Sequence, residues 1–195
     1  MQKISMDYKE TLSNLKKDLL KRLEKYVKRR KHVEGVASCM MAFSIKYDLD
    51  IEKALIIAYL HDLTKYESIT YHMKNIDQTD KDIFKNDPYY LHALSAAYIG
   101  KTHYQIHDPS ILNAVTYHCT GYQDLDIYGK LLIISDVCEP NRPYENAKDI
   151  YELAFINLEE AYRRSILIKY KSHLLHNDQT HPWFDTQIFN KKGHI

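Results

Sequence analysis

Six side chains of metal-ligand type lie on otherwise apolar faces in five separate segments of this 195-residue chain. They are His32, His61, Asp62, His92, His118 and Asp136. A single histidine on an apolar face is more often a satisfied core residue than a ligand. A buried carboxylate, however, needs a cation, and no Lys or Arg is expected on the faces opposite Asp62 and Asp136. The joint pattern therefore predicts a divalent metal site.

The donor types and their number narrow the chemistry of this site. Imidazole and carboxylate suit iron, manganese, zinc or cobalt, and the absence of expected thiolate ligands argues against a structural zinc. Six donors exceed what one open catalytic ion needs, so we expect two ions about 3.5–4 Å apart, with the central Asp62 as the bridge. Such a pair produces a hydroxide nucleophile near neutral pH and neutralises phosphate oxygens. The pattern points to hydrolysis of a phosphoester or phosphoanhydride.

The segments that carry these residues show helical periodicity. In residues 51–58 and again in 111–115, apolar residues recur at the three- and four-residue steps of a helix. An aspartate suited to an N-cap precedes each pattern, Asp50 in the first and Asp108 in the second, where a proline follows. Five glycines and five prolines are few for this length. We predict an all-α fold, a single helical bundle.

Other segments give weaker patterns. The apolar run before Asp136 would suit a strand by periodicity alone, but no other segment offers a strand partner, so a buried helix is preferred. Residues 12–27 are expected to form one amphipathic helix, residues 67–88 a loop with one short helix near 81–85, and residues 147–175 one long helix. The remaining histidines lie on polar stretches and are expected at the surface: His72, His103, His107, His173, His176, His181 and His194.

Composition excludes several classes of partner. The net charge of +1 gives no electrostatic case for nucleic acid or membrane surfaces. No apolar run reaches the roughly 18 residues of a membrane span, and the N-terminus lacks the apolar core of a signal peptide. The three cysteines, Cys39, Cys119 and Cys138, are scattered and are expected to be buried, reduced thiols of a cytoplasmic protein.

The order of the candidate ligands resembles a known signature. His32, then His61-Asp62, then Asp136 is similar to the H…HD…D pattern of the HD superfamily of metal-dependent phosphohydrolases. The blocks RRKHVEGV, HDLTKY, LHALSAAYIG, AVTYHCTGY and LLIISDVCEPNR resemble the successive motifs of the YqeK family within it. The likeness runs from about Arg29 to the end of the chain, and its YH-x-T-G and EPNR elements are more specific than the HD pair.

This resemblance implies a fold and an activity. Residues 29–195 would form an HD phosphohydrolase domain, with residues 1–28 as an N-terminal helix packing on it. The expected reaction is symmetrical cleavage of diadenosine tetraphosphate to two ADP at a centre of two divalent ions, with iron as the first expectation. By resemblance, one ion would be held by His32, His61, Asp62 and Asp136. The other would be held by Asp62, His92 and His118.

The resemblance also implies substrate contacts. Asp62 and Lys65 are the expected catalytic residues, and Lys65 lies one turn past Asp62. Arg29, Lys65 and Arg142 would contact the polyphosphate. Thr120 and Gly121 would shape the pocket beside His118.

The sequence leaves other functions open. A related HD enzyme could hydrolyse another nucleotide, a guanosine tetraphosphate alarmone or a cyclic dinucleotide. A domain of a different class would bind metal or nucleotide as a sensor without turnover. The expected partner in each case is a small nucleotide, and a homodimer is an open alternative to a monomer.

Overall fold

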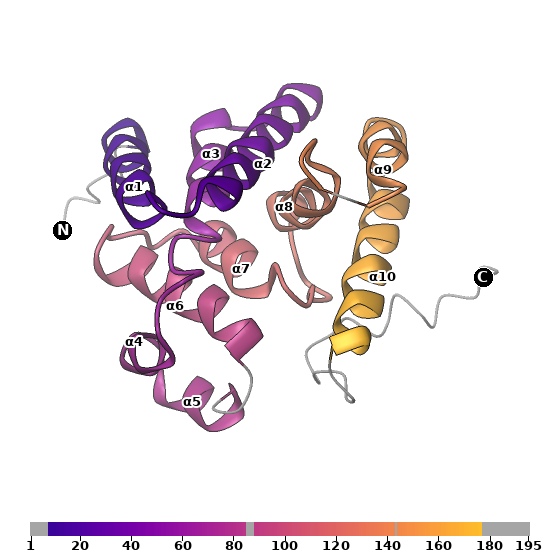
Figure 1. The fold of residues 1–195 in the computed structure, drawn as a ribbon. Coiled ribbons are helices and arrows are strands. Elements are labelled where there is room, and N and C mark those ends of the chain that lie inside the picture. Colours follow the sequence, from indigo (N-terminus) through magenta and orange to yellow (C-terminus); the bar gives the residue numbers. More distant parts are fainter. Residues whose placement is uncertain (1–7, 85–87, 143, 177–195) are drawn as a thin grey trace.

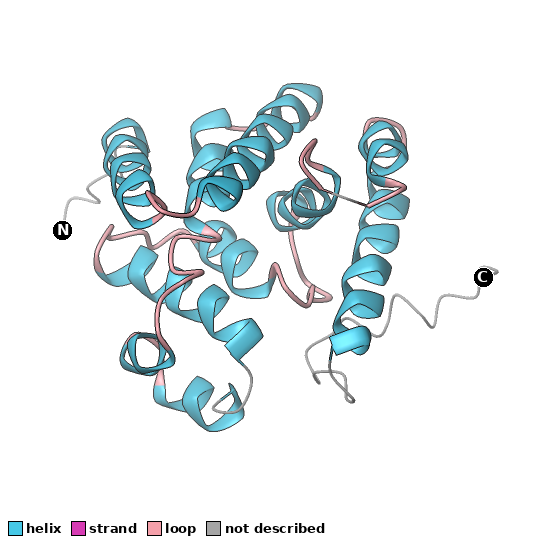
Figure 2. Cartoon of the chain, in the orientation of Figure 1, coloured by secondary structure: helices cyan, strands magenta, loops and turns pink. Residues whose placement is uncertain are grey.

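The computed structural model describes residues 8–84, 88–142 and 144–176, and the regular structure of these residues is helical throughout (Figure 1). Figure 2 shows helices and loops and no strand in this part of the chain. The all-α prediction is confirmed. The helices are α1 (Tyr8–Arg22), α2 (Val27–Lys46), α3 (Ile51–Leu60), α4 (Ile69–Lys74), α5 (Gln78–Phe84), α6 (Pro88–Thr102), α7 (Pro109–Tyr117), α8 (Ile127–Cys138), α9 (Ala147–Ala154) and α10 (Leu158–His176).

Helix α8 lies at the centre of the bundle, in contact with α2, α7, α9 and α10 (Figure 1). Every residue from Leu131 to Cys138 is buried. A helix that is covered on all sides carries apolar residues around its whole circumference, which explains why its sequence also suits a strand. The preference for a buried helix here is confirmed.

Helix α1 packs on α3 through buried leucines on one face, Leu15 and Leu19. These side chains join the same apolar core as α2, α3 and α8. The Tyr104 hydroxyl, just after α6, donates to Asp18 of α1 at 2.7 Å. The N-terminal helix is thus attached to the bundle by both apolar and polar contacts, while the division of the chain at residue 28 stays a prediction.

Helix starts follow the expected chemistry. The Asp50 carboxylate accepts a hydrogen bond from the Lys53 amide at 3.0 Å, and the Asp108 carboxylate accepts one from the Ser110 amide at 2.9 Å. Each bond satisfies an amide that has no partner within its helix. Both caps were predicted and both are confirmed.

The boundaries of three predicted segments are wrong. The long helix expected over residues 147–175 is two helices, α9 and α10, because Asn157 begins a new one by accepting from the Glu160 amide at 3.1 Å. The loop expected over residues 67–88 contains two helices, α4 and α5. The single helix expected over residues 12–27 ends at Arg22, and α2 begins at Val27.

The surface prediction for the remaining histidines is partly wrong. His103 and His107 are exposed as expected, but His72 and His173 are buried. The side chain of His176, together with residues 177–195 of the expected HD domain, lies outside the part that the structure describes. None of the described helices combines the length and the apolar character that crossing a bilayer requires.

Candidate metal centre

Five helices bring the six predicted ligands to one place in the core. His32 lies on α2, His92 on α6 and Asp136 on α8, while His61 and His118 are the C-caps of α3 and α7. Each of the six residues is at most 5% exposed. Contacts between their side chains join them into one cluster, as the sequence pattern predicts.

Two of the histidines are held by the backbone carbonyl three residues earlier. His61 Nδ1 lies 2.6 Å from the Ala58 oxygen, and His118 Nδ1 lies 2.7 Å from the Val115 oxygen. A carbonyl can only accept, so Nδ1 carries the proton in both rings and donates it. The Nε2 atom of each neutral ring is then left with a lone pair, which is the arrangement found in metal-ligating histidines.

His32 is oriented by a carboxylate that sequence reasoning missed. Its Nδ1 lies 3.1 Å from Oε1 of Glu139, which is 1% exposed and follows α8. Oε2 of Glu139 accepts from the backbone and side-chain nitrogens of Asn141, both at 2.8 Å. The signal for this residue was present in the sequence, since Glu139 is the first residue of the EPNR block. A carboxylate–histidine pair of this kind fixes the ring and raises its basicity as a ligand.

Gly35 makes room for this carboxylate. A Cβ added at Gly35 would lie 2.2 Å from Glu139 Oε2, much closer than any real contact. Gly35 follows His32 by less than one helical turn, so the same face of α2 presents the ring and accommodates the group that orients it.

The Nε2 atoms point at carboxylate oxygens. His61 Nε2 lies 3.4 Å from Asp62 Oδ2, and it is a buried nitrogen without a hydrogen-bond partner in the described part of the chain. His32 Nε2 lies 3.1 Å from Asp136 Oδ1 and 3.6 Å from Asp62 Oδ2. Burial lowers the pKa of His32, but its hydrogen bonds to Asp136 and Glu139 outweigh burial and raise it. Each of these nitrogens thus lies where a cation, either a proton or a metal ion, is stabilised by a carboxylate, so this donor set fits a divalent metal.

A second group of donors lies on the other side of Asp62. His92 Nε2 is 3.3 Å from Asp62 Oδ1 and 3.2 Å from His118 Nε2. Cys119, expected to be a buried thiol, is buried, with Sγ 3.5 Å from His118 Nε2. Burial raises the pKa of this thiol to about 11. The two oxygens of Asp62 therefore face two different sets of histidines.

Both carboxylates are paired with cations, which corrects one expectation. Arg29 lies 2.8 Å from Asp62 Oδ2, and Arg142 and Lys169 both pair with Asp136. The prediction that no basic residue faces these carboxylates was wrong. Arg29 lies on α2 less than one turn before His32, whereas the positions of Lys169 on α10 and Arg142 after α8 do not follow from helical periodicity around the motif.

The charges around the two carboxylates control their protonation. Burial opposes ionisation of Asp62, but its interactions with His61, Lys65 and His92 outweigh burial and hold its pKa well below the usual value. Burial likewise opposes ionisation of Asp136, and the charges of Lys169 and Arg142 hold its pKa well below the usual value. Both groups are therefore ionised acceptors at neutral pH.

Three of the six donors, Asp62, His118 and Asp136, line a cavity of about 270 Å³ that has basic walls. Arg29, Lys65 and Arg142, three of the predicted substrate contacts, line it, and so does Lys169. Lys65 Nζ lies 3.0 Å from His92 Nε2. Ionised groups of one sign on the walls of a cleft attract ligands of the opposite sign, so the cavity suits an anion.

The other two predicted contacts, Thr120 and Gly121, are not among the residues that line this cavity. The buried Thr120 hydroxyl donates to the Gly121 oxygen at 3.0 Å. Gly121 has a φ of 73°, and a Cβ there would lie 2.7 Å from Ile166. The structure thus places these residues in the tight turn behind His118, where glycine is required by both conformation and space.

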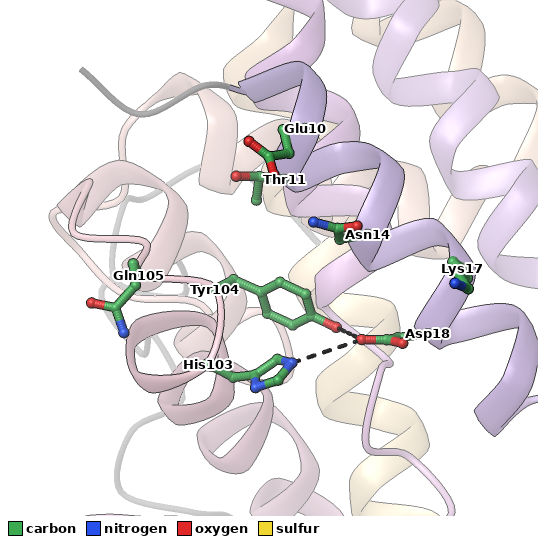
Figure 3. Close-up of a pocket in the computed structure, with 8 residues that line it drawn as sticks. All are labelled: Glu10, Thr11, Asn14, Lys17, Asp18, His103, Tyr104 and Gln105. Atoms are coloured by element: carbon green, nitrogen blue, oxygen red, sulfur yellow. Dashed lines mark hydrogen bonds and ion pairs between the residues drawn. The ribbon is translucent and has the colours of Figure 1, made fainter. Parts of the chain in front are cut away.

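A second hollow lies beside the N-terminal helix, α1. It has a volume of about 420 Å³ and lies between α1 and the segment that follows α6 (Figure 3). Tyr104 and His103 both point at Asp18 there, at 2.7 and 3.9 Å. These contacts connect α1 to the bundle, and they do not involve any of the six candidate ligands.

Comparisons with known proteins agree with this geometry. The HD domain family matches residues 29–141. The symmetrical bis(5'-nucleosyl)-tetraphosphatase of Bacillus subtilis is 27% identical over 164 residues, 83% of this chain and 84% of that protein. The protein of the same name from Staphylococcus aureus is 31% identical over 130 residues, 66% of this chain and 67% of that protein.

The fold is also shared with a solved structure. A crystal structure of a predicted HD superfamily hydrolase involved in NAD metabolism from Clostridium acetobutylicum superposes with a TM-score of 0.80. The superposition covers 92% of this chain and 97% of that one, at 23% sequence identity. At this identity the likeness concerns the arrangement of the helices.

Proposed function

This chain belongs to the HD domain family, and from that premise we propose that it is a metal-dependent hydrolase that cleaves dinucleoside tetraphosphates symmetrically. Diadenosine tetraphosphate would give two ADP. Two relatives carry the name of this activity and align with most of this chain.

One structural observation carries the proposal. The Nε2 atoms of His32 and His61 face the Asp62 and Asp136 carboxylates, while their Nδ1 atoms lie against Glu139 and the Ala58 carbonyl. A core that only needed to pack would not gather imidazole nitrogens and carboxylates at one place. The arrangement is suited to hold a cation.

The two sides of Asp62 support a centre of two ions. One ion would be held by His32, His61, Asp62 and Asp136, and the other by Asp62, His92 and His118. Iron is the first choice for both, and manganese, zinc and cobalt suit the same donors. Bound there, such ions supply a nucleophile from water at neutral pH and withdraw charge from phosphate oxygens.

The side chains of the cavity would position the substrate. Arg29, Lys65 and Arg142 offer charge-assisted hydrogen bonds to phosphate oxygens, and the planar guanidinium groups can bind two oxygens at once. Their excess of positive charge favours a polyphosphate over a phosphate monoester. Asp62 and Lys65 would be the residues nearest the reacting phosphate.

Product analysis tests this function directly. Metal-loaded protein is incubated with diadenosine tetraphosphate, and the nucleotides are separated by ion-exchange chromatography. We expect ADP as the sole product, and no product from the Asp62→Ala variant. ATP with AMP would show asymmetric cleavage. Turnover of another nucleotide or alarmone alone, or binding without turnover, would equally refute the proposal.

We further propose that the protein acts in the cytoplasm. Cys39, Cys119 and Cys138 are all buried free thiols, as is usual in a reducing compartment. Fractionation of cells followed by immunodetection tests the location, and recovery from an extracellular fraction would contradict it.

A further inference from the structure

Lys169 is a buried lysine whose position is not explained by packing alone. It lies on α10, beyond the residues that match the HD domain family, and it is only 6% exposed. Lysine is rarely buried to this extent unless its charge is paired. Its Nζ pairs with Asp136 Oδ2.

Asp136 has more cationic partners than a single carboxylate needs. Arg142 pairs with Oδ1 and also donates to the backbone oxygen of Asp136 at 2.7 Å. His32 Nε2 lies 3.1 Å from the same Oδ1. Removing Lys169 would therefore leave Asp136 with other partners, so a counter-ion role alone does not require a lysine at this position.

The surroundings of Lys169 suggest what else its ammonium contacts. It lines the basic cavity together with Arg29, Lys65 and Arg142, and Ser172, from the next turn of α10, lines the same wall. Helix α10 packs against α8, which carries Asp136 (Figure 1). One wall of the cavity is thus supplied by a helix outside the matched residues 29–141.

We propose that Lys169 is a phosphate-binding residue of this site. A metal ion held by Asp136 would take up part of its negative charge, and the Lys169 ammonium would then be available to bind a phosphate oxygen of the ligand in the cavity. A lysine suits this role because its compact charge sits on a flexible stem with three donors. The inference rests on the proposed function for the class of ligand, a polyphosphate, and adds a contact from α10.

The test uses a ligand that the enzyme cannot hydrolyse. Methylenediphosphonate is titrated calorimetrically into the metal-loaded wild-type chain and the variants Lys169→Met, Lys169→Arg and Lys171→Met. Methionine keeps the apolar length of lysine without the charge, and Lys171 is an exposed position on the same helix. The metal content of each protein is measured alongside.

We expect the dissociation constant of methylenediphosphonate to rise roughly 10- to 100-fold in Lys169→Met, the effect of one lost hydrogen bond to a charged group. Lys169→Arg should recover part of this affinity, and Lys171→Met should equal the wild type. All four proteins should bind the same amount of metal.

Two results would overturn the proposal. Unchanged affinity in metal-loaded Lys169→Met would show that the ammonium does not contact phosphate. Loss of bound metal from Lys169→Met, with metal and affinity both restored in Lys169→Arg, would make Lys169 a counter-ion of Asp136 instead. Both results are independent of whether the wild type releases ADP from diadenosine tetraphosphate, so a failure of the proposed function is recognised separately.

Discussion

Replacing Glu139 by glutamine should weaken metal binding without changing any of the six candidate ligands. Glu139 accepts three hydrogen bonds: one from His32 Nδ1 at 3.1 Å and two from Asn141 nitrogens at 2.8 Å each. These bonds outweigh the effect of burial and lower the pKa of Glu139, so the native acceptor is ionised. Glutamine preserves the size of the side chain but removes the charge and one accepting atom.

The size of the expected loss of metal affinity follows from these hydrogen bonds. The amide of the introduced glutamine can take two orientations. If its oxygen faces His32, the Asn141 donors face an NH₂ group. If its oxygen faces Asn141, His32 Nδ1 loses its acceptor. A hydrogen bond to a charged group contributes about 1.5–3 kcal/mol, compared with about 1 kcal/mol for a neutral pair. Loss of such a partner behind a ligating histidine typically weakens metal binding by about 10- to 100-fold. We expect a change of this size.

Competition with a chelator measures the effect. The metal-free protein is titrated with Mn²⁺ in the presence of a fluorescent chelator, with Glu34→Gln as the matched control. Glu34 is exposed on α2, the helix of His32, so the same change there should leave the affinity unaltered. A Glu139→Gln variant with wild-type circular dichroism and an affinity within twofold of the wild type would refute the proposed role of the carboxylate.

Three further changes test neighbouring parts of the centre. Gly35→Ala places a Cβ 2.2 Å from Glu139 Oε2, so we expect this variant to bind Mn²⁺ roughly tenfold more weakly. Combining it with Glu139→Gln should cause little further loss of affinity, because both changes act through one contact. Additive losses in the double variant would contradict this coupling. Asp62→Ala removes the acceptor shared by both histidine sets and should abolish metal retention in elemental analysis, whereas retained metal would exclude its central role. In the metal-free protein, burial lowers the pKa of His92 to about 4. Because the unfolded state then binds the proton more readily, stability should fall as the pH drops from about 6.5 to about 4, by up to about 3 kcal/mol from this residue. The free energy of unfolding in urea, measured for the wild type and His92→Asn across that pH range, checks the sign of this effect. Equal slopes of stability against pH in the two proteins would refute it.

The convergence of the six candidate ligands could be predicted because each interrupts a regular apolar pattern. His61 and Asp62 end the stripe of α3, and His118 ends that of α7. Polar donors at the buried ends of apolar helices must meet something in the core. The identity of α8 as a helix followed from the lack of any strand partner in the sequence.

The buried lysine beside Asp136 could not be predicted in the same way. Lys169 and Lys171 are two residues apart on a charged stretch of α10, yet one is buried against Asp136 and the other is exposed. Which lysine faces inward depends on where α10 begins, and that depends on the break at Asn157, which the apolar pattern from Ile150 onward does not reveal.

The burial of His72 had a similar cause. Its neighbours in sequence are polar, but His72 Nδ1 lies 2.8 Å from the Ser95 hydroxyl of α6. Ser95 in turn contacts the Thr64 hydroxyl at 2.8 Å. A polar side chain satisfied by partners from distant segments gives no periodic signal, since its burial depends on tertiary contacts.

The rings of His32, His61 and His118 differ in how easily a mutation can change the group that orients them. The acceptors behind His61 and His118 belong to the main chain at residues 58 and 115, so a change of side chain at either residue does not delete the acceptor atom. His32 instead relies on a side chain, Glu139, that a single nucleotide change in the gene can replace. Natural or laboratory variation in ion affinity should therefore accumulate around residue 139, while the tautomers of His61 and His118 persist through most substitutions nearby.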